Sequence, residues 1–152
     1  MRVWRVCSRR YRAFDGEGAR LYGGRWNPHG TRAVYTSGSL SLAALECFVN
    51  LDPDLLPRGL VAMPAEIPDD VRIQQITIRD LPRNWRDAPA PEALRDLGTA
   101  WVSRGATAVL AVPSAVIPKE WNYLLNPAHP DLRRIRMGGP EPFRFDPRMW
   151  KH

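Results

Sequence analysis

The sequence has few of the features that would place a protein in a membrane or outside a cell. No run of about 18 apolar residues occurs, so no segment is predicted to span a bilayer. The first residues, Met1–Arg5, lack the apolar core of a signal peptide. There are only two cysteines, Cys7 and Cys47, and their spacing fits neither a metal site nor a disulfide framework. These absences predict a cytoplasmic protein with two reduced thiols.

Histidine is scarce, and internal repeats and low-complexity linkers are absent. The three histidines, His29, His129 and His152, are spread along the chain, so we expect no metal site. His129 follows the turn-forming Asn126-Pro127, which favours a structural role for it. A length of 152 residues with 44% hydrophobic residues predicts one globular domain, residues 1–152, with a core of its own.

Positive charge is concentrated at the amino-terminal end. Residues 1–35 hold eight arginines against Asp15 and Glu17, a local net charge of +6, whereas the remaining basic and acidic residues cancel. Such a field suits an anionic small ligand, a nucleic acid or an acidic protein partner. A basic face that is merely solvated is an alternative of equal weight. Because no recognition helix and no basic, aromatic-rich sheet is evident, a nucleic-acid-binding module is a remote alternative.

The segment Gly23-Gly-Arg-Trp-Asn-Pro28 is the most distinctive part of this region. Adjacent glycines let a backbone approach a ligand closely, and an arginine can grip an anion through charge-assisted hydrogen bonds. We therefore expect this loop to hold the phosphates of a dinucleotide, with Arg25 as their contact and a second turn at Gly30. Trp26 is expected to pack beneath the loop in preference to touching an adenine.

Apolar periodicity predicts an α+β fold, with a mixed sheet and two helices. The predicted strands are residues 3–6, 32–36, 59–63, 71–78, 107–112, 132–137 and 143–145. The first helix begins after Ser39 or Ser41 and continues to Leu51, and the second covers residues 90–104. The most continuously apolar strand, 107–112, is expected to be central. Residues 8–24 are predicted to be a long loop, the proline-rich segment 113–130 no regular helix, and residues 148–152 a peripheral tail.

The first predicted helix carries an apolar stripe at helical spacing, and an acid lies beside it. The stripe consists of Leu42, Leu45, Phe48 and Val49. From its position alone, Glu46 is more consistent with a surface residue than with a functional one.

Several segments, taken in order, resemble the RES domain, the toxin half of bacterial Xre–RES toxin–antitoxin pairs. They are Gly23-Gly-Arg-Trp-Asn27, Val34-Tyr-Thr-Ser37, Leu42-Ala-Ala-Leu-Glu46, and Val112–Pro118 with Asn122–Pro127. The resemblance extends from about Val3 to Met137. It implies a fold similar to ADP-ribosyltransferase toxins, which bind NAD in a cleft of a mixed α/β core.

The resemblance also implies the residues of the site. The expected catalytic residues are Arg25, Glu46 and Ser114, and the expected NAD contacts are Arg5, Arg25, Tyr35, Ser114 and Asn126. For Asn126 and Asn122, a role in satisfying a turn is the favoured interpretation. No metal and no cofactor besides NAD as the substrate is expected.

Family members break the nicotinamide–ribose bond of NAD by hydrolysis, by phosphorolysis or by transfer of ADP-ribose to a protein. Cleavage passes through an oxocarbenium-like state, so the protein must supply orientation and negative charge near the ribose. Glu46 is expected to do both, while Arg25 and Arg5 hold the pyrophosphate. The resemblance therefore implies a toxin that depletes NAD, or alternatively an ADP-ribosyltransferase acting on a protein. It implies an Xre-like antitoxin as the partner, with nucleic acid bound only through that partner.

Overall fold

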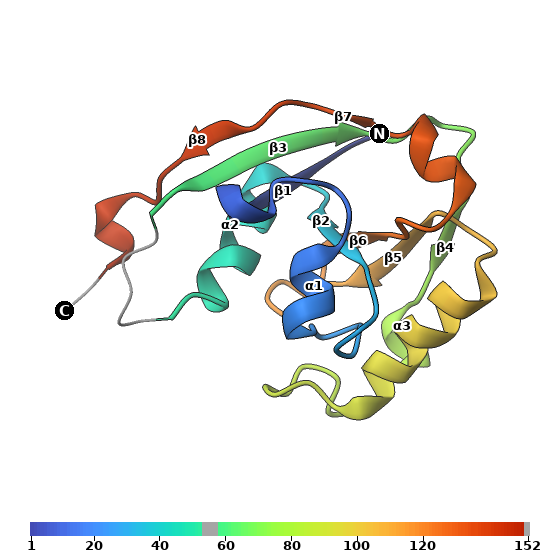
Figure 1. Cartoon of the computed structure of the whole chain (residues 1–152). Helices are drawn as coiled ribbons and strands as arrows, with labels where there is room; N and C mark the ends of the chain where they lie inside the picture. Colours follow the sequence, from blue (N-terminus) through green and yellow to red (C-terminus); the bar gives the residue numbers. More distant parts are fainter. Residues whose placement is uncertain (53–57, 151–152) are drawn as a thin grey trace.

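The computed structural model describes residues 1–52 and 58–150, and one curled, mixed β-sheet forms the centre of this part of the chain (Figure 1). The strand order is β4-β5-β6-β2-β1-β3-β7, and β8 also pairs with β3. The strands are β1 (Arg2–Ser8), β2 (Val34–Ser37), β3 (Leu60–Glu66), β4 (Ile73–Gln75), β5 (Val109–Pro113), β6 (Trp121–Leu125), β7 (Arg136–Met137) and β8 (Glu141–Phe143). Strands β4 and β5 are parallel and the other pairs antiparallel, which confirms the predicted mixed α/β class.

Three α-helices and four short 3-10 helices complete the described elements. They are α1 (Glu17–Tyr22), α2 (Leu40–Val49), α3 (Glu92–Arg104), η1 (Arg9–Tyr11), η2 (Ile78–Asp80), η3 (Pro130–Arg134) and η4 (Pro147–Met149). Helix α2 begins after Ser39, whose hydroxyl accepts the Leu42 N–H (3.1 Å), so the predicted start is confirmed. Helix α3 ends at Gly105, which adopts the left-handed conformation that this position favours.

The core has two clusters of buried side chains. The first consists of Val3, Val34, Ala65, Ile67, Val71, Ala108, Val109, Leu125 and Ile135. The second joins the loop after α1 to α3 and the sheet, and consists of Trp26, Ile76, Trp85, Leu94, Trp101, Leu110, Val112 and Leu124. Strand β5 contributes to both clusters and all five of its residues are buried, as its apolar run predicts. It lies one strand from the edge of the sheet, beside β4, and is therefore less central than expected.

Residues 8–24 are not one long loop, because η1 and α1 form within them. Helix α1 has only six residues, too few to be stable through local hydrogen bonds alone. Its first turn carries Glu17, which forms ion pairs with Arg20 (2.6 Å) and Arg32 (2.9 Å). Gly23 ends the helix with a positive φ of 69°. Carbonyl groups of the helix also accept hydrogen bonds from the following loop, from Asn27 Nδ2 to Ala19 (2.8 Å) and from the Gly30 N–H to Arg20 (2.9 Å), and a local pattern does not reveal these contacts.

The segment 113–130 contains a strand that periodicity did not identify. Strand β6 lies between β5 and β2, and the four prolines of the segment, Pro113, Pro118, Pro127 and Pro130, all lie outside it. The predicted strand 71–78 shortens to β4, followed by η2, and the predicted strand 132–137 becomes η3 and the short β7. These differences matter for the site, because β6 carries one of its residues.

In the described part of the tail, residues 148–150, Arg148 and Met149 are exposed as a peripheral tail predicts, whereas Trp150 packs against α2. The Trp150 ring lies 5.2 Å from that of Phe48 and 6.2 Å from that of Phe145, which in turn contacts Phe143. On α2 itself, Leu42 is buried as predicted, whereas Val49 is 56% exposed. The predicted apolar stripe is therefore not buried along its whole length, because at the carboxyl end of α2 its last member, Val49, is exposed to solvent.

The cysteines and the helices bear on two expectations from the sequence. Cys7 and Cys47 are free thiols, as predicted, and burial raises the pKa of Cys47 to about 11. Among the helices of the described residues, none has the length and apolarity needed to cross a membrane.

Candidate functional site

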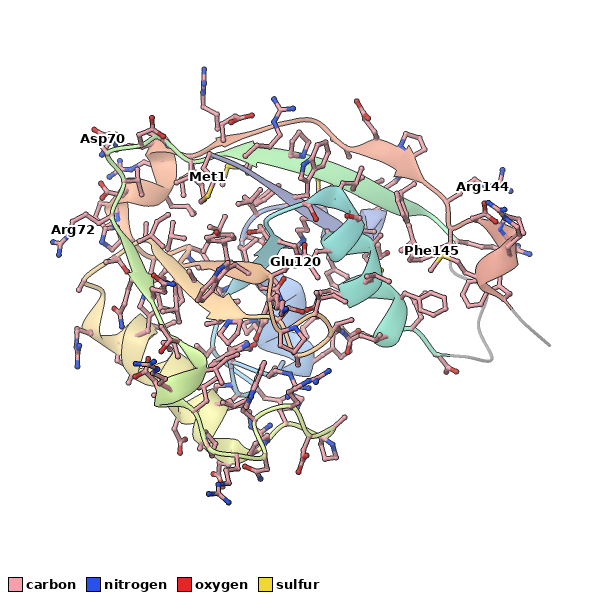
Figure 2. The ribbon with its side chains drawn as sticks, turned by 180° about the vertical axis from the view of Figure 1, so that it is seen from behind. Met1, Asp70, Arg72, Glu120, Arg144 and Phe145 are labelled. Carbon is pink, nitrogen blue, oxygen red and sulfur yellow. The ribbon has the colours of Figure 1, made fainter. Side chains whose placement is uncertain are left out.

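Glu46 projects from α2 toward the ends of β5 and β6. Ser114 Oγ donates a hydrogen bond to Glu46 Oε1 (2.6 Å), and Asn122 Nδ2 donates to the same oxygen (2.7 Å). Glu120, whose carbonyl accepts the Ser114 N–H (3.0 Å), marks this end of the sheet in Figure 2. Glu46 is half-buried and hydrogen-bonded to two other elements of the fold, so it is not the freely solvated surface side chain that its place in the sequence favoured.

Ser114 follows β5 directly and is held by the turn after that strand. Its hydroxyl oxygen accepts the N–H groups of Val116 (3.1 Å) and Ile117 (3.0 Å), and the residue is fully buried. Because both lone pairs are engaged, the single hydroxyl hydrogen is directed to Glu46. The geometry therefore supports a role for Ser114 in orienting Glu46 and leaves its hydroxyl no free hydrogen for a contact with NAD.

Asn122 lies within β6, so the turn role favoured for it is wrong. It pairs in register with Ser37 of β2, and Ser37 Oγ donates to Asn122 Oδ1 (2.7 Å). We call Glu46, Ser114, Asn122 and Ser37 the carboxylate network. Within residues 1–52 and 58–150, no side chain or backbone group donates to the second oxygen of Glu46, Oε2.

Tyr35 links β2 to the glycine-containing loop. Its hydroxyl donates to Asn27 Oδ1 (2.6 Å) and accepts the Trp26 N–H (3.0 Å). Asn27 is buried, and its Nδ2 donates to three backbone carbonyls of residues 19–31 at 2.8–3.1 Å. Burial raises the pKa of the Tyr35 phenol, which is therefore protonated at neutral pH. The hydroxyl is used within the loop, so only the ring of Tyr35 is left to contact a ligand.

The two adjacent glycines have roles in the packing of this loop. A Cβ on Gly24 would stand 2.6 Å from Tyr35 Oη and 2.8 Å from Asn27 Oδ1, while Gly23 caps α1. The close approach that Gly24 permits is therefore to Tyr35, which corrects the expectation of an approach to a ligand. Gly30 adopts a positive φ of 91°, as expected of a turn. Trp26 is 3% exposed beneath the loop, which confirms its predicted packing role.

Arg25 extends from the same loop to the segment before α3. Its Nη1 donates to the carbonyls of Trp85 (2.8 Å) and Asp87 (3.0 Å). Burial lowers the pKa of the Arg25 guanidinium, and the nearby Glu46 carboxylate acts in the opposite direction. Folding thus brings Arg25, Tyr35, Glu46 and Ser114 into one region, although they are far apart in the sequence.

Two of the expected NAD contacts lie elsewhere. Arg5 Nη2 donates to the Tyr11 carbonyl (3.2 Å), and its guanidinium lies over the Phe14 ring (5.8 Å). Asn126 follows the far end of β6, where its side chain accepts the Ala128 N–H (3.0 Å) and closes the turn predicted for it. In the described part of the chain, neither residue forms a hydrogen bond with the carboxylate network.

The histidines are not gathered into a site. His129 Nδ1 accepts the Asp131 N–H (3.0 Å) and caps η3, which confirms its structural role. His29 Nδ1 is hydrogen-bonded to the Leu21 carbonyl (2.9 Å). His152 lies outside the described residues. No group of three or more His, Cys, Asp or Glu side chains in residues 1–52 and 58–150 is arranged to hold a metal ion.

Sequence reasoning missed two residues of the carboxylate network, Ser37 and Asn122. Both lie in segments that carry the family resemblance, but β6 was not recognised as a strand, so nothing placed them opposite each other. The alternation of Trp121, Asn122 and Tyr123 was a local signal for a strand, but it is too short to decide between a strand and a turn.

Replacing Tyr35 with phenylalanine is expected to lower the free energy of unfolding by about 2–4 kcal/mol, because two buried polar groups lose their partner. These groups are the Trp26 N–H and Asn27 Oδ1. Chemical denaturation measures the effect. The control is Tyr123→Phe, since among the described residues the Tyr123 hydroxyl has no hydrogen-bond partner. Equal stability of the two variants would contradict the assigned role of the Tyr35 hydroxyl.

Comparison with known proteins places this architecture among related chains. The RES domain family model matches residues 2–146. A protein of Sphingobium sp. (strain YBL2), named Prs ADP-ribosylating toxin, is 39% identical over 152 residues, which cover 96% of this chain and 94% of that protein. A Yersinia enterocolitica protein named Toxin Res is also 39% identical, covering 98% of this chain and 99% of its own.

A solved structure has a similar fold. A chain in the crystal structure of the M. tuberculosis MbcT–MbcA toxin–antitoxin complex aligns with a TM-score of 0.71. The alignment covers 92% of this chain and 82% of that chain at 16% sequence identity. At this identity the likeness concerns the fold alone.

Proposed function

This chain belongs to the RES domain family, and from that premise we propose that it is the toxin of a toxin–antitoxin pair that binds NAD and cleaves its nicotinamide–ribose bond. The observation that carries the proposal is the anchored carboxylate of Glu46. Ser114 and Asn122 both donate to Oε1, while Oε2 accepts nothing from the described residues. A carboxylate fixed in this way is suited to stabilising a developing positive charge.

The proposed reaction needs little acid catalysis. The bond between ribose C1 and the nicotinamide nitrogen breaks, and its electron pair leaves with nicotinamide as a neutral base. The sugar carbon acquires oxocarbenium character, which the Glu46 carboxylate stabilises while Oε2 accepts a hydrogen bond from a ribose hydroxyl. An acceptor oxygen then bonds to C1 and releases its proton to solvent. This route requires no metal and no cofactor besides NAD.

Arg25 is proposed to hold the pyrophosphate. Its Nη1 is anchored to two carbonyls, whereas Nε and Nη2 make no hydrogen bond with the described residues. The Nε–H and Nη2–H groups lie side by side on one edge of the guanidinium, and such an edge can donate to two oxygens of a phosphate group. The Tyr35 ring is proposed to border the nicotinamide, since its hydroxyl is already used. Arg5 and Asn126 are not assigned a contact with NAD in this proposal.

The identity of the acceptor distinguishes two forms of the function. Water or phosphate as the acceptor would deplete cellular NAD and inhibit growth. A protein side chain as the acceptor would make the chain an ADP-ribosyltransferase, and the name of the Sphingobium relative, Prs ADP-ribosylating toxin, supports that alternative. Both forms require the same bond to nicotinamide to break.

We further propose that the toxin acts in the cytoplasm and is inhibited by an Xre-like antitoxin. The similarity to a chain crystallised in a toxin–antitoxin complex supports a protein partner of this kind. In this proposal nucleic acid is bound only through the antitoxin.

Product analysis tests the proposal directly. The purified protein is incubated with NAD in the presence and absence of phosphate, and the products are separated by chromatography and identified by mass. We expect free nicotinamide together with ADP-ribose or its 1-phosphate. Radiolabelled NAD with cell extract reveals transfer to a protein. If no nicotinamide is released under any of these conditions, the proposed function is wrong.

A further inference from the structure

Every hydrogen bond of the carboxylate network is donated toward Glu46: Ser37 donates to Asn122, and Asn122 and Ser114 donate to Glu46. An ionised Glu46 can only accept hydrogen bonds, so Asn122 must present Nδ2 to it. The Asn122 Oδ1 then faces Ser37, whose hydroxyl donates to it (2.7 Å). The carboxylate thus sets which way the Asn122 amide is turned, and the Ser37 hydroxyl holds the amide in that orientation.

This orientation is built into the sheet. Asn122 and Ser37 lie directly opposite each other on β6 and β2, so their side chains emerge on the same face. Strand β6 is also paired with β5, and β2 with β1, so both residues are held by ladders on either side. Ser37 is 4% exposed. The donor to Glu46 therefore belongs to the rigid sheet, while Glu46 belongs to α2, an element that could otherwise shift relative to it.

Resting on the proposed function, we propose that Ser37 and Asn122 are positioning residues, which fix the carboxylate of Glu46 so that Oε2 faces the ribose. Ser114 anchors the same oxygen from the turn after β5. Two donors from different elements restrict Oε1 in direction as well as distance, and this restricts the rotation of the carboxylate. Neither Ser37 nor Asn122 needs to touch NAD for this role.

The same pair of strands provides a matched control. Thr36 is 3% exposed and donates through Oγ1 to the Tyr123 carbonyl of β6 (2.7 Å). Its side chain lies on the opposite face of β2 from that of Ser37. Thr36→Val therefore removes an equally buried link between β2 and β6 without affecting the carboxylate network.

The first test compares steady-state kinetics of NAD cleavage. We expect Ser37→Ala and Asn122→Ala to lower kcat by about 10- to 100-fold, because a misplaced catalytic group loses its alignment. The KM for NAD should change by less than about threefold, since binding is assigned mainly to other residues. Thr36→Val should retain wild-type kcat. A fall in kcat for Thr36→Val equal to that for Ser37→Ala would overturn the proposal.

The second test uses thermal unfolding without NAD, so it does not depend on activity. Asn122→Asp places a carboxylate against Glu46 and should lower Tm by about 2–4 °C. In the double variant with Glu46→Gln, the charge at position 46 is removed and its amide oxygen can still accept from Ser114. The repulsion is then lost, so the fall in Tm should be smaller than the sum of the two single losses. Additive losses in this cycle would contradict the contact. If the cycle shows coupling but the wild type releases no nicotinamide, the proposed function fails and the contact stands.

Discussion

Replacing Glu46 with glutamine is expected to lower the rate of NAD cleavage by about 100- to 1,000-fold, the effect of removing one well-placed electrostatic contact from an active site. Glutamine has the same shape, and its amide oxygen can still accept from Ser114 and Asn122. The fold should therefore persist, and the loss should arise from the missing charge beside the developing cation. Growth inhibition should disappear with the activity.

The release of nicotinamide from NAD measures this effect, and circular dichroism checks the fold. Glu120→Gln is the control, because Glu120 is an exposed carboxylate at the same end of the sheet (Figure 2). It should retain wild-type activity. A Glu46→Gln variant with activity within threefold of the wild type would show that Glu46 is not the catalytic carboxylate.

Replacing Gly98 with alanine is expected to lower the free energy of unfolding by about 4 kcal/mol or more, enough to remove much of the stability of an ordinary domain. Gly98 lies on the buried face of α3, between Leu94 and Trp101. A Cβ at this position would overlap the carbonyl oxygen of Trp26 and stand 2.8 Å from its carbonyl carbon. Because these are backbone atoms, no change of rotamer relieves the overlap.

The predicted loss of stability is a strict test, because helix propensity alone predicts a gain. On that ground alone, alanine at an interior helical position stabilises by about 1 kcal/mol relative to glycine. Gly139→Ala is the control, since a Cβ there meets no atom within 4 Å and its backbone is not in the left-handed region. Denaturant unfolding of both variants distinguishes the two effects. A Gly98→Ala protein as stable as the wild type would contradict the packing of α3 against the loop.

Gly98 also connects the fold to the site. Trp26, which it contacts, stands between Arg25 and Asn27 in the loop. Asn27 organises that loop through its hydrogen bonds, and Arg25 extends from it toward Glu46. Any displacement of α3 from Trp26 would therefore move the guanidinium that is proposed to hold the pyrophosphate.

Local patterns predicted much of the architecture. The Ser39 cap and the glycine after α3 predicted helix boundaries, because such signals act within a few residues. The apolar run before Ser114 predicted a buried strand that ends at this serine, and the structure has β5 there. The family resemblance supplied Arg25, Tyr35, Glu46 and Ser114 as a set, which the fold gathers into one region.

The errors have a common physical origin. Position along α2 favoured the surface for Glu46, but two donors from β6 and the turn after β5 turn it inward. Asn122 was assigned to a turn because β6 is short and flanked by prolines. Gly24 was expected to approach a ligand, whereas the nearest groups are the Tyr35 hydroxyl and the Asn27 side chain. For Glu46 and Asn122 the deciding contacts join residues that are far apart in the sequence, whereas those of Gly24 lie within eleven residues and depend on how the loop folds back on itself.

The amino-acid sequence alone determined the fold class, the start of α2, the extent of α3 to within two residues and the set of family residues, since these depend on propensities, caps and motifs that are complete within short segments. Only the tertiary structure decided that Glu46 is anchored through one oxygen, that Ser37 holds the amide of Asn122, and that Gly98 must lack a side chain. These features depend on distances of 3 Å or less between elements separated by 68 to 85 residues, and packing sets such distances.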